Sequence, residues 1–528
     1  MGFLRHVFRW LSLALIALAG AWLLWPARDG EAASARRDGR DAANRAEARH
    51  VITLSPGSAY LPGAVPFGVG QPLVGLAAVI RDFEKRFPDT RVEIINVPGV
   101  REYIVTQLSS GRAPDIINVN VEDVWTDVQK GWYVPLDAYL EAPNPFIREK
   151  GDPTAPGYHQ WWDMFKYQAI SRGKAAPDGR NYCISFDMVE TAIFYNKDIF
   201  AKVGVSVPTT WEQWLDDMAK LEAAGYTPLL MSIYAFNDWC VDLIFDQLYY
   251  AVLPGIDLLQ DPTREKYLEG YLDWDELCFL YRQGFFTPRD PRYAELWRHM
   301  RALRKYCNRN LANIDTDREF VTQQGAMYWT ACPLTYRLMA DKELGFEWGV
   351  FYLPRFTTAT SEFASETEMC VIGGAGMQYE VTNSAYNDTG DPATSEKLER
   401  VIALLQFMTV PEHYERIVNE YPCFLPNVVG VPVLPSLEPF EAILERRYTT
   451  TKWIFTFDLR FSEIQQRMLE LYLNDGIALD AFLEWQEANL EAATQNLLAR
   501  KNVDMARLER EWDRRAPLRA DTRGLPYD

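Results

Sequence analysis

The stretch FYNKDIFAKVGVSVPTTWEQW (194–214) contains the end of a strand, a helix cap and the start of a second helix. The apolar run AIFY (192–195) overlaps its beginning and predicts a buried strand. Asn196 follows at a position where its side chain can accept backbone N–H groups, so we expect it to cap a short helix that runs through Phe200. Pro208 then introduces a further helix. The stretch therefore predicts a strand–helix–helix unit.

The second helix carries its own start and stop signals. Thr210 is followed three residues later by Gln213, which is the pattern of a capping box. Trp211 and Trp214 fall on the apolar face of this helix, so we assign the pair to helix packing and not to a ligand. Gly225 is expected to end the helix.

Strands and helices alternate in the first part of the folded chain. Helical spacing predicts a helix over LVGLAAVIRDFEKRF (73–87) and another over EYIVTQLSSG (102–111). The strands expected around them are VITL (51–54), RVEIINV (91–97) and the apolar start of APDIINVNVEDVW (113–125). This alternation is typical of a parallel α/β sheet with right-handed crossovers.

Later segments continue the mixture of strands and helices. FEWGVFYLPRF (346–356) predicts a strand and a turn, and EMCVIGGAGMQYEV (368–381) predicts a strand broken by two glycines. EKLERVIALLQFMTVPEHY (396–414) has the spacing of one amphipathic helix. The rest of the last 150 residues is mostly helical in pattern.

Composition limits the classes of function. The chain has 528 residues, enough for two or more domains, and 54 Lys and Arg against 73 Asp and Glu give a net charge of −19. Such an acidic chain is not expected to bind nucleic acid. Its 17 Trp and 27 Tyr will mostly be core residues, but flat amphipathic side chains also suit sugar-binding surfaces.

The sequence contains no motif for a metal or an organic cofactor. The seven cysteines are too far apart for a zinc-knuckle or Cys-x-x-Cys motif, and no His-Glu-x-x-His pattern occurs. No phosphate loop, nucleophile elbow or dinucleotide fingerprint falls in the required strand–helix context. We therefore expect no metal, no cofactor and no catalytic residues. The cysteines are either paired in an oxidising compartment or buried as thiols.

The N-terminus has the form of a targeting segment. Arg5 and Arg9 precede an apolar run (10–25), and Ala33-Ser34-Ala35 offers a small-x-small cleavage site. Residues 1–35 are thus a cleaved signal peptide or an uncleaved anchor, and 36–50 are expected to be a flexible tether. Either alternative exports the rest of the chain, to the periplasm or to the outer face of the cytoplasmic membrane.

The order of segments along the chain resembles the bacterial extracellular solute-binding proteins of ABC importers, in the carbohydrate-type family that includes maltose- and glycerol-phosphate-binding proteins. The quoted stretch, extended to FYNKDIFAKVGVSVPTTWEQWLDDMAKLEAAGYTPL (194–229), is similar to the family signature. Seven further segments resemble the family in the same order: FEKRFPDTRVEI (83–94), SSGRAPDIINV (109–119), VPLDAYL (134–140), DGRNYCISFD (178–187), FVTQQGAMYWTACP (320–333), FMTVPEHYERIV (407–418) and LPNVVGVP (425–432). The chain departs from the family at Ser185, where proline is frequent, and has no cysteine placed for a lipid anchor.

The resemblance implies a two-lobed, type II periplasmic-binding-protein fold of class α/β. Each lobe is expected to hold a mainly parallel sheet flanked by helices, with a ligand cleft between the lobes. The implied first lobe comprises 51–165 and 367–430, and the second comprises 166–366 and 431–528. The implied function is capture of a sugar, oligosaccharide or similar polar solute, and its delivery to the permease subunits of an ABC importer, by a protein that acts as a monomer.

Candidate ligand-binding residues lie where polar loops leave strands. In the first half they are Tyr60, Asn118, Asn120, Glu122, Asp123, Asp187 and Glu190. In the second half they are Asn237, Asp238, Trp239, Trp329, Thr330 and Trp453, of which Trp329 and Thr330 carry the strongest family analogy. Each has a structural alternative: Asn118 to Asp123 as helix caps, Tyr60 in loop packing, and the tryptophans, Trp453 above all, in the core.

Two other functions remain open at this point. Acids and tryptophans in a cleft also suit an exported glycoside hydrolase or lyase, although nothing in the sequence fixes a carboxylate pair. A membrane-tethered receptor that presents its ligand to a sensor is the other alternative, and an uncleaved N-terminus would favour it.

Overall fold

The structure is a computed structural model that describes residues 48–519, apart from 69, 98–100, 120–123, 125–126, 167–175, 177, 260–271, 273, 313–315, 375, 445–446, 450–457 and 501. The signal or anchor segment 1–35 and most of the predicted tether lie outside the described residues. Within the described part, no helix combines the length and the apolar character that spanning a bilayer needs.

A five-stranded sheet forms the first half of the fold, which we call the first lobe. Its strand order is β2-β1-β3-β10-β4. The strands are β1 (His50–Leu54), β2 (Thr90–Ile94), β3 (Ile116–Ile117), β4 (Cys183–Ser185) and β10 (Gln378–Val381). β1 pairs with β2 and β3 in parallel, whereas β10 runs antiparallel to both of its neighbours. The alternation of strands and helices predicted for 51–117 is therefore confirmed.

A second sheet forms the core of what we call the second lobe, in the order β12-β9-β5-β7-β6, with β8 and β11 also paired to β5. The strands are β5 (Asp187–Asn196), β6 (Thr227–Leu230), β7 (Gly325–Ala331), β8 (Trp348–Phe351), β9 (Met369–Gly374), β11 (Leu425–Pro426) and β12 (Arg447–Thr449). β5 is antiparallel to β7, β8, β9 and β11. The expectation of a mainly parallel sheet is wrong for this lobe.

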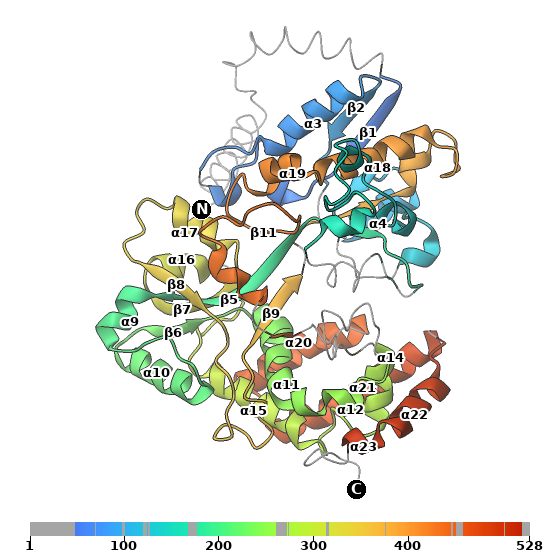
Figure 1. The fold of residues 1–528 in the computed structure, drawn as a ribbon. Helices are drawn as coiled ribbons and strands as arrows, with labels where there is room; N and C mark the ends of the chain where they lie inside the picture. The colour runs from blue at the N-terminus through green and yellow to red at the C-terminus, as the bar shows by residue number, and fades with distance from the viewer. Residues whose placement is uncertain are drawn as a thin grey trace, which may run out of the picture.

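Three chain segments cross between the lobes, and the first two run in opposite directions, which explains the antiparallel pairing; the third enters the second sheet at β11, which pairs with β5. β4 lies in the first sheet and β5 in the second, with Phe186 between them. β9 and β10 make the return crossing. Figure 1 shows β5 as the long strand that leaves the upper lobe for the lower one, with β9 beside it. Sheet membership thus changes at Phe186 and between Gly374 and Gln378, whereas the predicted lobe boundaries lie at 165/166 and 366/367.

Helices cover both sheets (Figure 1). The first lobe has α3 (Gly75–Arg86), α4 (Arg101–Ser109), α6 (Asp137–Leu140), α7 (Pro145–Arg148), α18 (Glu396–Met408) and α19 (Pro411–Val418). Around the second sheet lie α9 (Lys197–Val203), α10 (Trp211–Ala223), α16 (Thr316–Val321) and α17 (Leu334–Ala340). The remaining helices are α11 (Val241–Tyr249), α12 (Leu253–Ile256), α14 (Trp274–Arg282), α15 (Pro291–Arg304), α20 (Leu459–Leu473), α21 (Leu479–Arg500), α22 (Met505–Arg514) and α23 (Ala516–Arg519).

The strand–helix–helix unit predicted from 194–214 is confirmed. Asn196 caps α9 by accepting the N–H of Ile199 at 2.9 Å. The side chain of Thr210 accepts the N–H of Gln213 at 3.3 Å, but the side chain of Gln213 accepts the N–H of Thr209 at 3.1 Å and not that of Thr210. The reciprocal half of the capping box is therefore shifted by one residue.

The amphipathic pattern over 396–414 does not form one helix. α18 ends at Met408, and α19 begins at Pro411. Proline has no N–H to donate and its ring clashes with the preceding turn, so it starts a helix well but interrupts one. The prediction of a continuous helix is wrong because Pro411 overrides the periodicity.

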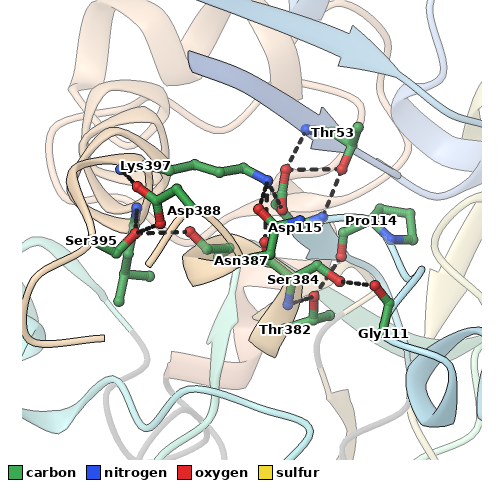
Figure 2. A network of polar contacts seen from close by, with 12 residues as sticks. Thr53, Gly111, Pro114, Asp115, Thr382, Ser384, Asn387, Asp388, Ser395 and Lys397 are labelled. Carbon is green, nitrogen blue, oxygen red and sulfur yellow. Dashed lines mark hydrogen bonds and ion pairs between the residues drawn. The ribbon is translucent and has the colours of Figure 1, made fainter. Parts of the chain in front are cut away.

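A buried ion pair connects α18, which follows the return of the chain to the first lobe, to the sheet of that lobe (Figure 2). Asp115, just before β3, accepts the N–H and the hydroxyl of Thr53 at 2.7 and 2.9 Å. Lys397 in α18 reaches the other carboxylate oxygen of Asp115 at 2.8 Å. Nearby, the hydroxyl of Thr382 donates to the carbonyl oxygen of Pro114 at 2.8 Å. These contacts join segments almost 300 residues apart along the chain into one lobe.

Candidate functional site

Three of the site candidates, Tyr60, Asn118 and Asp187, gather where the chain passes from the first sheet to the second. We call this region the lobe junction and define it by Phe186, Asp187 and Gly376–Gln378. Asp187 begins β5 and is fully buried. One of its oxygens accepts the N–H groups of Gly376 and Met377 at 2.8 and 2.9 Å. The carboxylate therefore fastens the strand that enters the second lobe to the segment that leaves it.

Tyr60 meets Asp187 at the same point. Its hydroxyl group donates to the second carboxylate oxygen of Asp187 at 2.5 Å. Burial and the neighbouring Asp187 raise the pKa of the Tyr60 hydroxyl well above its ordinary value. The ring packs edge-on against Phe186 and Phe424, at centroid distances of 5.6 and 6.1 Å. The structure thus brings two predicted site residues together, and their polar atoms bond to each other.

Asn118 lies close to the same segment. Its amide donates to the carbonyl oxygen of Gln378 at 2.8 Å, which ties the end of β3 to β10. The side chains of Asn118 and Met377 leave no room for a side chain at Gly57, since a Cβ there would lie 2.9 Å from Asn118 Oδ1 and 2.6 Å from Met377 Sδ. Gly57 also has a φ of 75°, a conformation that glycine adopts without strain. Tyr60, Asn118 and Asp187 therefore converge on Gly376–Gln378.

Glu190 lies three residues after Asp187 in β5 and is fully buried. One of its carboxyl oxygens accepts the N–H of Thr191 at 3.1 Å, and among the described residues the other has no hydrogen-bond partner. Desolvation raises the pKa of this carboxyl well above its ordinary value. The group lies inside the second sheet, where it offers no surface to a sugar.

An aromatic pair at the junction was not among the residues predicted from the sequence. Phe67, in the loop after β1, and Tyr336, in α17, have ring centroids 6.2 Å apart and planes inclined by 34°. Phe67 is 49% exposed. Tyr336 comes from the second lobe but packs against the apolar core of the first. We call these two residues the junction pair.

The loop that carries Phe67 is held in a restricted conformation. Phe67 has a φ of 52°, a region that few residues other than glycine occupy and that is often found at functional positions. A Cβ at Gly70 would lie 2.0 Å from the Tyr336 hydroxyl, so only glycine lets the loop pass this side chain. The sequence already indicated an unusual loop conformation in GAVPFGVG (63–70), where three glycines surround a single phenylalanine.

Tyr421 packs against Tyr336 of the junction pair. Its ring lies edge-on to Tyr336 at 5.0 Å, and its hydroxyl donates to the carbonyl oxygen of Ala59 at 2.7 Å. Because Ala59 is next to Tyr60, these contacts connect α17 of the second lobe to the loop after β1. The aromatic groups of the junction therefore form one connected set that includes both lobes.

The candidates after β6 lie in a short π-helix, Ala235–Cys240, a type of turn that is frequent at functional sites. Asn237 is partly buried, and Trp239 is partly buried against the apolar core of the second lobe. The side chain of Asp238 lies outside what the structure describes. Tyr234, one residue before the turn, is 64% exposed and was not predicted.

Trp329 does not present a ring to solvent. It lies in β7 opposite Ile193 of β5, belongs to the core of the second lobe and is 2% exposed. Thr330, its neighbour in β7, pairs with Ala192 and is partly buried. The structural alternative thus fits Trp329 better than a stacking role. Asn120, Glu122, Asp123 and Trp453 lie outside the described residues.

Among the described residues, no group of three or more His, Cys, Asp or Glu side chains is arranged to hold a metal ion. The groups present at the junction are instead aromatic rings, tyrosine hydroxyls and backbone groups. Such a set can bind a neutral, hydroxyl-rich molecule through ring contacts and hydrogen bonds.

Residues 71–274 match the family described as bacterial extracellular solute-binding protein. A multiple sugar-binding protein of Streptococcus mutans is 24% identical over 162 residues, which cover 30% of this chain and 33% of that protein. A putative binding protein of Brucella abortus is 26% identical over 152 residues, covering 28% of this chain and 32% of that protein. The chain thus spans about a third of the length of the curated relatives it matches.

Solved structures resemble the chain over most of its length. The solute-binding protein RafE in complex with raffinose has a TM-score of 0.55 at 17% identity, covering 84% of this chain and 99% of that one. The sugar-binding protein MalE from Xanthomonas citri has a TM-score of 0.56 at 15% identity, covering 85% and 97%. A chitin oligosaccharide binding protein has the same TM-score and identity, covering 84% and 99%. These likenesses confirm the two-lobed α/β fold, and the family match agrees with the resemblance found in the sequence over residues 71–274.

Proposed function

We propose that this chain, whose residues 71–274 match the bacterial extracellular solute-binding protein family, captures a saccharide or a similar polar solute outside the cytoplasm and delivers it to an ABC importer. The observation that carries the proposal is the junction pair. Phe67 and Tyr336 come from different lobes, and their ring centroids are 6.2 Å apart, so the rings contact each other here. Parting of the lobes would separate the rings, and a solute that entered between them would touch both lobes.

Aromatic faces suit the apolar side of a sugar ring, while hydroxyl and carbonyl groups suit its rim. Phe67 supplies an exposed ring with no polar group of its own, and Tyr336 adds a hydroxyl. The names of the relatives support the same class of ligand, since they include proteins described as binding raffinose, chitin oligosaccharide and multiple sugars.

The crossing strands supply the movement that capture requires. The two sheets are joined by β4–β5, by β9–β10 and by the segment that enters β11, and a hinge at Phe186 and before Gln378 lets the lobes part and close. Opening separates Phe67 from Tyr336 and admits the solute. Closing brings the rings onto it, and the closed form is the one recognised by the permease subunits. The protein acts as a monomer, in the periplasm or attached to the outer face of the cytoplasmic membrane.

Transport of an unchanged solute fits the junction better than glycoside cleavage does. Asp187 and Glu190, at the start of β5, have fully buried side chains. Asp187 is engaged by Tyr60 and by two backbone N–H groups, and Glu190 is enclosed within the second sheet. An acid and a base of a glycosidase must both reach the substrate.

A thermal-shift screen of the full chain against mono- and oligosaccharides, polyols and glycerol phosphates tests the proposal. At least one saccharide should raise the melting temperature in proportion to the logarithm of its concentration, and it should be recovered unchanged. Recovery of cleaved products would establish the hydrolase alternative. No shift with any of these compounds would overturn the sugar-binding proposal.

A further inference from the structure

Two cysteines from distant parts of the chain meet at Glu190. β7 pairs with β5 antiparallel up to Ala331 and Thr191, and the N–H of Cys332 then donates to the carbonyl oxygen of Glu190 at 2.8 Å. β11 pairs with the start of the same strand, Leu425 opposite Met188. Continuing that register by two residues brings Cys423 level with Glu190 as well. The end of β7 and the approach to β11 therefore reach the same point of β5.

The side chains confirm this proximity. The thiol of Cys332 donates to the carbonyl oxygen of Cys423 with an Sγ–O distance of 3.2 Å. Both thiols are buried, with exposed fractions of 0% and 3%. Cys332 packs in an apolar cluster of the second lobe with Phe194 and Leu334, whereas Cys423 packs in the core of the first lobe. Both cysteines are free thiols in this structure, and they meet where the two clusters adjoin.

We propose that Cys332 and Cys423 form a disulfide bond that joins the end of β7 to the segment entering β11, beside Glu190 of β5 and beyond the hinge at Phe186. The bond would close a loop of 91 residues. It requires an oxidising compartment and so rests on the export included in the proposed function.

The chemistry is a thiol–disulfide exchange with a disulfide-bearing oxidoreductase or a small disulfide such as oxidised glutathione. One thiol loses its proton and attacks the donor disulfide, which releases one donor thiolate and leaves a mixed disulfide on the chain. The second thiol loses its proton and displaces the remaining donor sulfur. The new S–S bond leaves the protein oxidised by two electrons, and the donor gains these electrons as two thiols.

Once the protein has folded, burial slows both the formation and the reduction of this disulfide bond. Burial raises the pKa of both thiols well above the ordinary range, and the nearby Asp187 acts on both in the same direction. A protonated thiol is a poor nucleophile, so exchange is slow once the junction is closed. The disulfide bond therefore forms while the chain folds, before the segment around Cys423 packs against the end of β7.

Peptide mapping of the full chain tests the proposal without any ligand. The protein is unfolded with a reductant, refolded in a buffer of oxidised and reduced glutathione, treated with an alkylating agent and digested. One cross-linked peptide pair containing Cys332 and Cys423 should appear, and it should separate into two alkylated peptides after reduction. Recovery of both cysteines as alkylated thiols, or of Cys423 joined to another cysteine, would overturn the proposal.

Variants extend the test to stability. The urea midpoint of the oxidised wild type should exceed that of the reduced wild type, because the cross-link restricts the unfolded chain. Cys423→Ser should abolish this difference, whereas Cys278→Ser, a change at a buried cysteine in α14, should retain it. An equal difference in Cys423→Ser would assign the redox effect to another pair. Should Cys423→Ser fail to fold, the mapping of the wild type still decides. Neither the peptide map nor the urea midpoint depends on a ligand. A failure of the sugar-binding proposal therefore leaves the test of the disulfide valid.

Discussion

The hydroxyl of Tyr60 donates a 2.5 Å hydrogen bond to Asp187, and this contact ties the loop after β1 to the first residue of the strand that enters the second lobe. Both side chains are almost completely buried. Asp187 also accepts two backbone N–H groups from the returning segment. A single carboxylate therefore connects three chain segments at the point where the lobes are expected to hinge.

Replacing Tyr60 with phenylalanine should destabilise the protein without ligand. The substitution keeps the ring and removes the donor, which leaves one carboxylate oxygen of Asp187 without this bond at a cost of about 1–3 kcal/mol. Urea unfolding at pH 7 measures the loss, with Tyr103→Phe, a change at an exposed tyrosine of α4, as the control. Unchanged stability combined with weaker ligand binding would instead make Tyr60 a ligand contact.

Glu190→Gln should increase stability in a pH-dependent way. Burial raises the pKa of Glu190, so between the pKa of the unfolded chain and that of the folded chain the folded state holds a proton that the unfolded state has released. Stability of the wild type therefore falls as pH rises above about 4.3, by up to about 1.4 kcal/mol per pH unit. Glutamine cannot ionise, so the variant should escape this loss.

Unfolding curves collected from pH 4 to pH 8 (pH steps of roughly one unit) measure this difference. The gain of Glu190→Gln over the wild type should grow with pH, whereas Glu93→Gln, a change at an exposed position in β2, should give a nearly constant difference. A gain that shrinks as pH rises would mean that Glu190 is ionised and paired in the folded protein.

Trp329→Ala should act on stability. The ring is buried in the core of the second lobe, so its removal leaves a cavity and should cost about 3–5 kcal/mol. Differential scanning calorimetry of the protein without ligand measures this as a lower melting temperature. Normal stability with loss of saccharide binding would restore the role that the sequence indicated for this residue.

The buried pair of Asp115 and Lys397 should be worth far more than an exposed pair. Asp115→Ala leaves the Lys397 ammonium group without this partner, and breaking a buried pair in this way costs about 3–5 kcal/mol. The control is Arg86→Ala, which breaks an ion pair with Glu149 in which both side chains are more than half exposed and should cost about 1 kcal/mol or less. Equal losses in urea unfolding would show that the network of Figure 2 does not hold the first lobe together.

Local sequence patterns predicted those elements of the fold that are determined by residues close together in the chain. The caps at Asn196 and Thr210 and the buried Trp211–Trp214 pair follow from spacing within one helix turn. The break at Pro411 was missed because the apolar period continues through it. Strand direction around β5 was missed because it depends on the crossings between the lobes, which no local pattern encodes.

The candidate site was harder to predict for the same reason. Polar residues near strand ends were chosen as ligand contacts, but Asp187 and Glu190 are buried by segments far away in the sequence, so their surroundings are set by tertiary packing. Phe67 and Tyr336 are separated by 269 residues, and the glycines around Phe67 mark an unusual loop without indicating which residue it contacts. Only the fold brings them together.

Titration calorimetry of the wild type and of Phe67→Ala, with the saccharide that gives the largest thermal shift, tests the junction pair most directly. Phe67 is half-exposed, so its removal should leave stability nearly unchanged while saccharide affinity falls about tenfold or more, a loss of about 1.4 kcal/mol or more. Tyr103→Ala, at an exposed tyrosine away from the pair, should bind like the wild type. Unchanged affinity in Phe67→Ala would contradict the account, because the ligand would then bind without the ring that defines the proposed site.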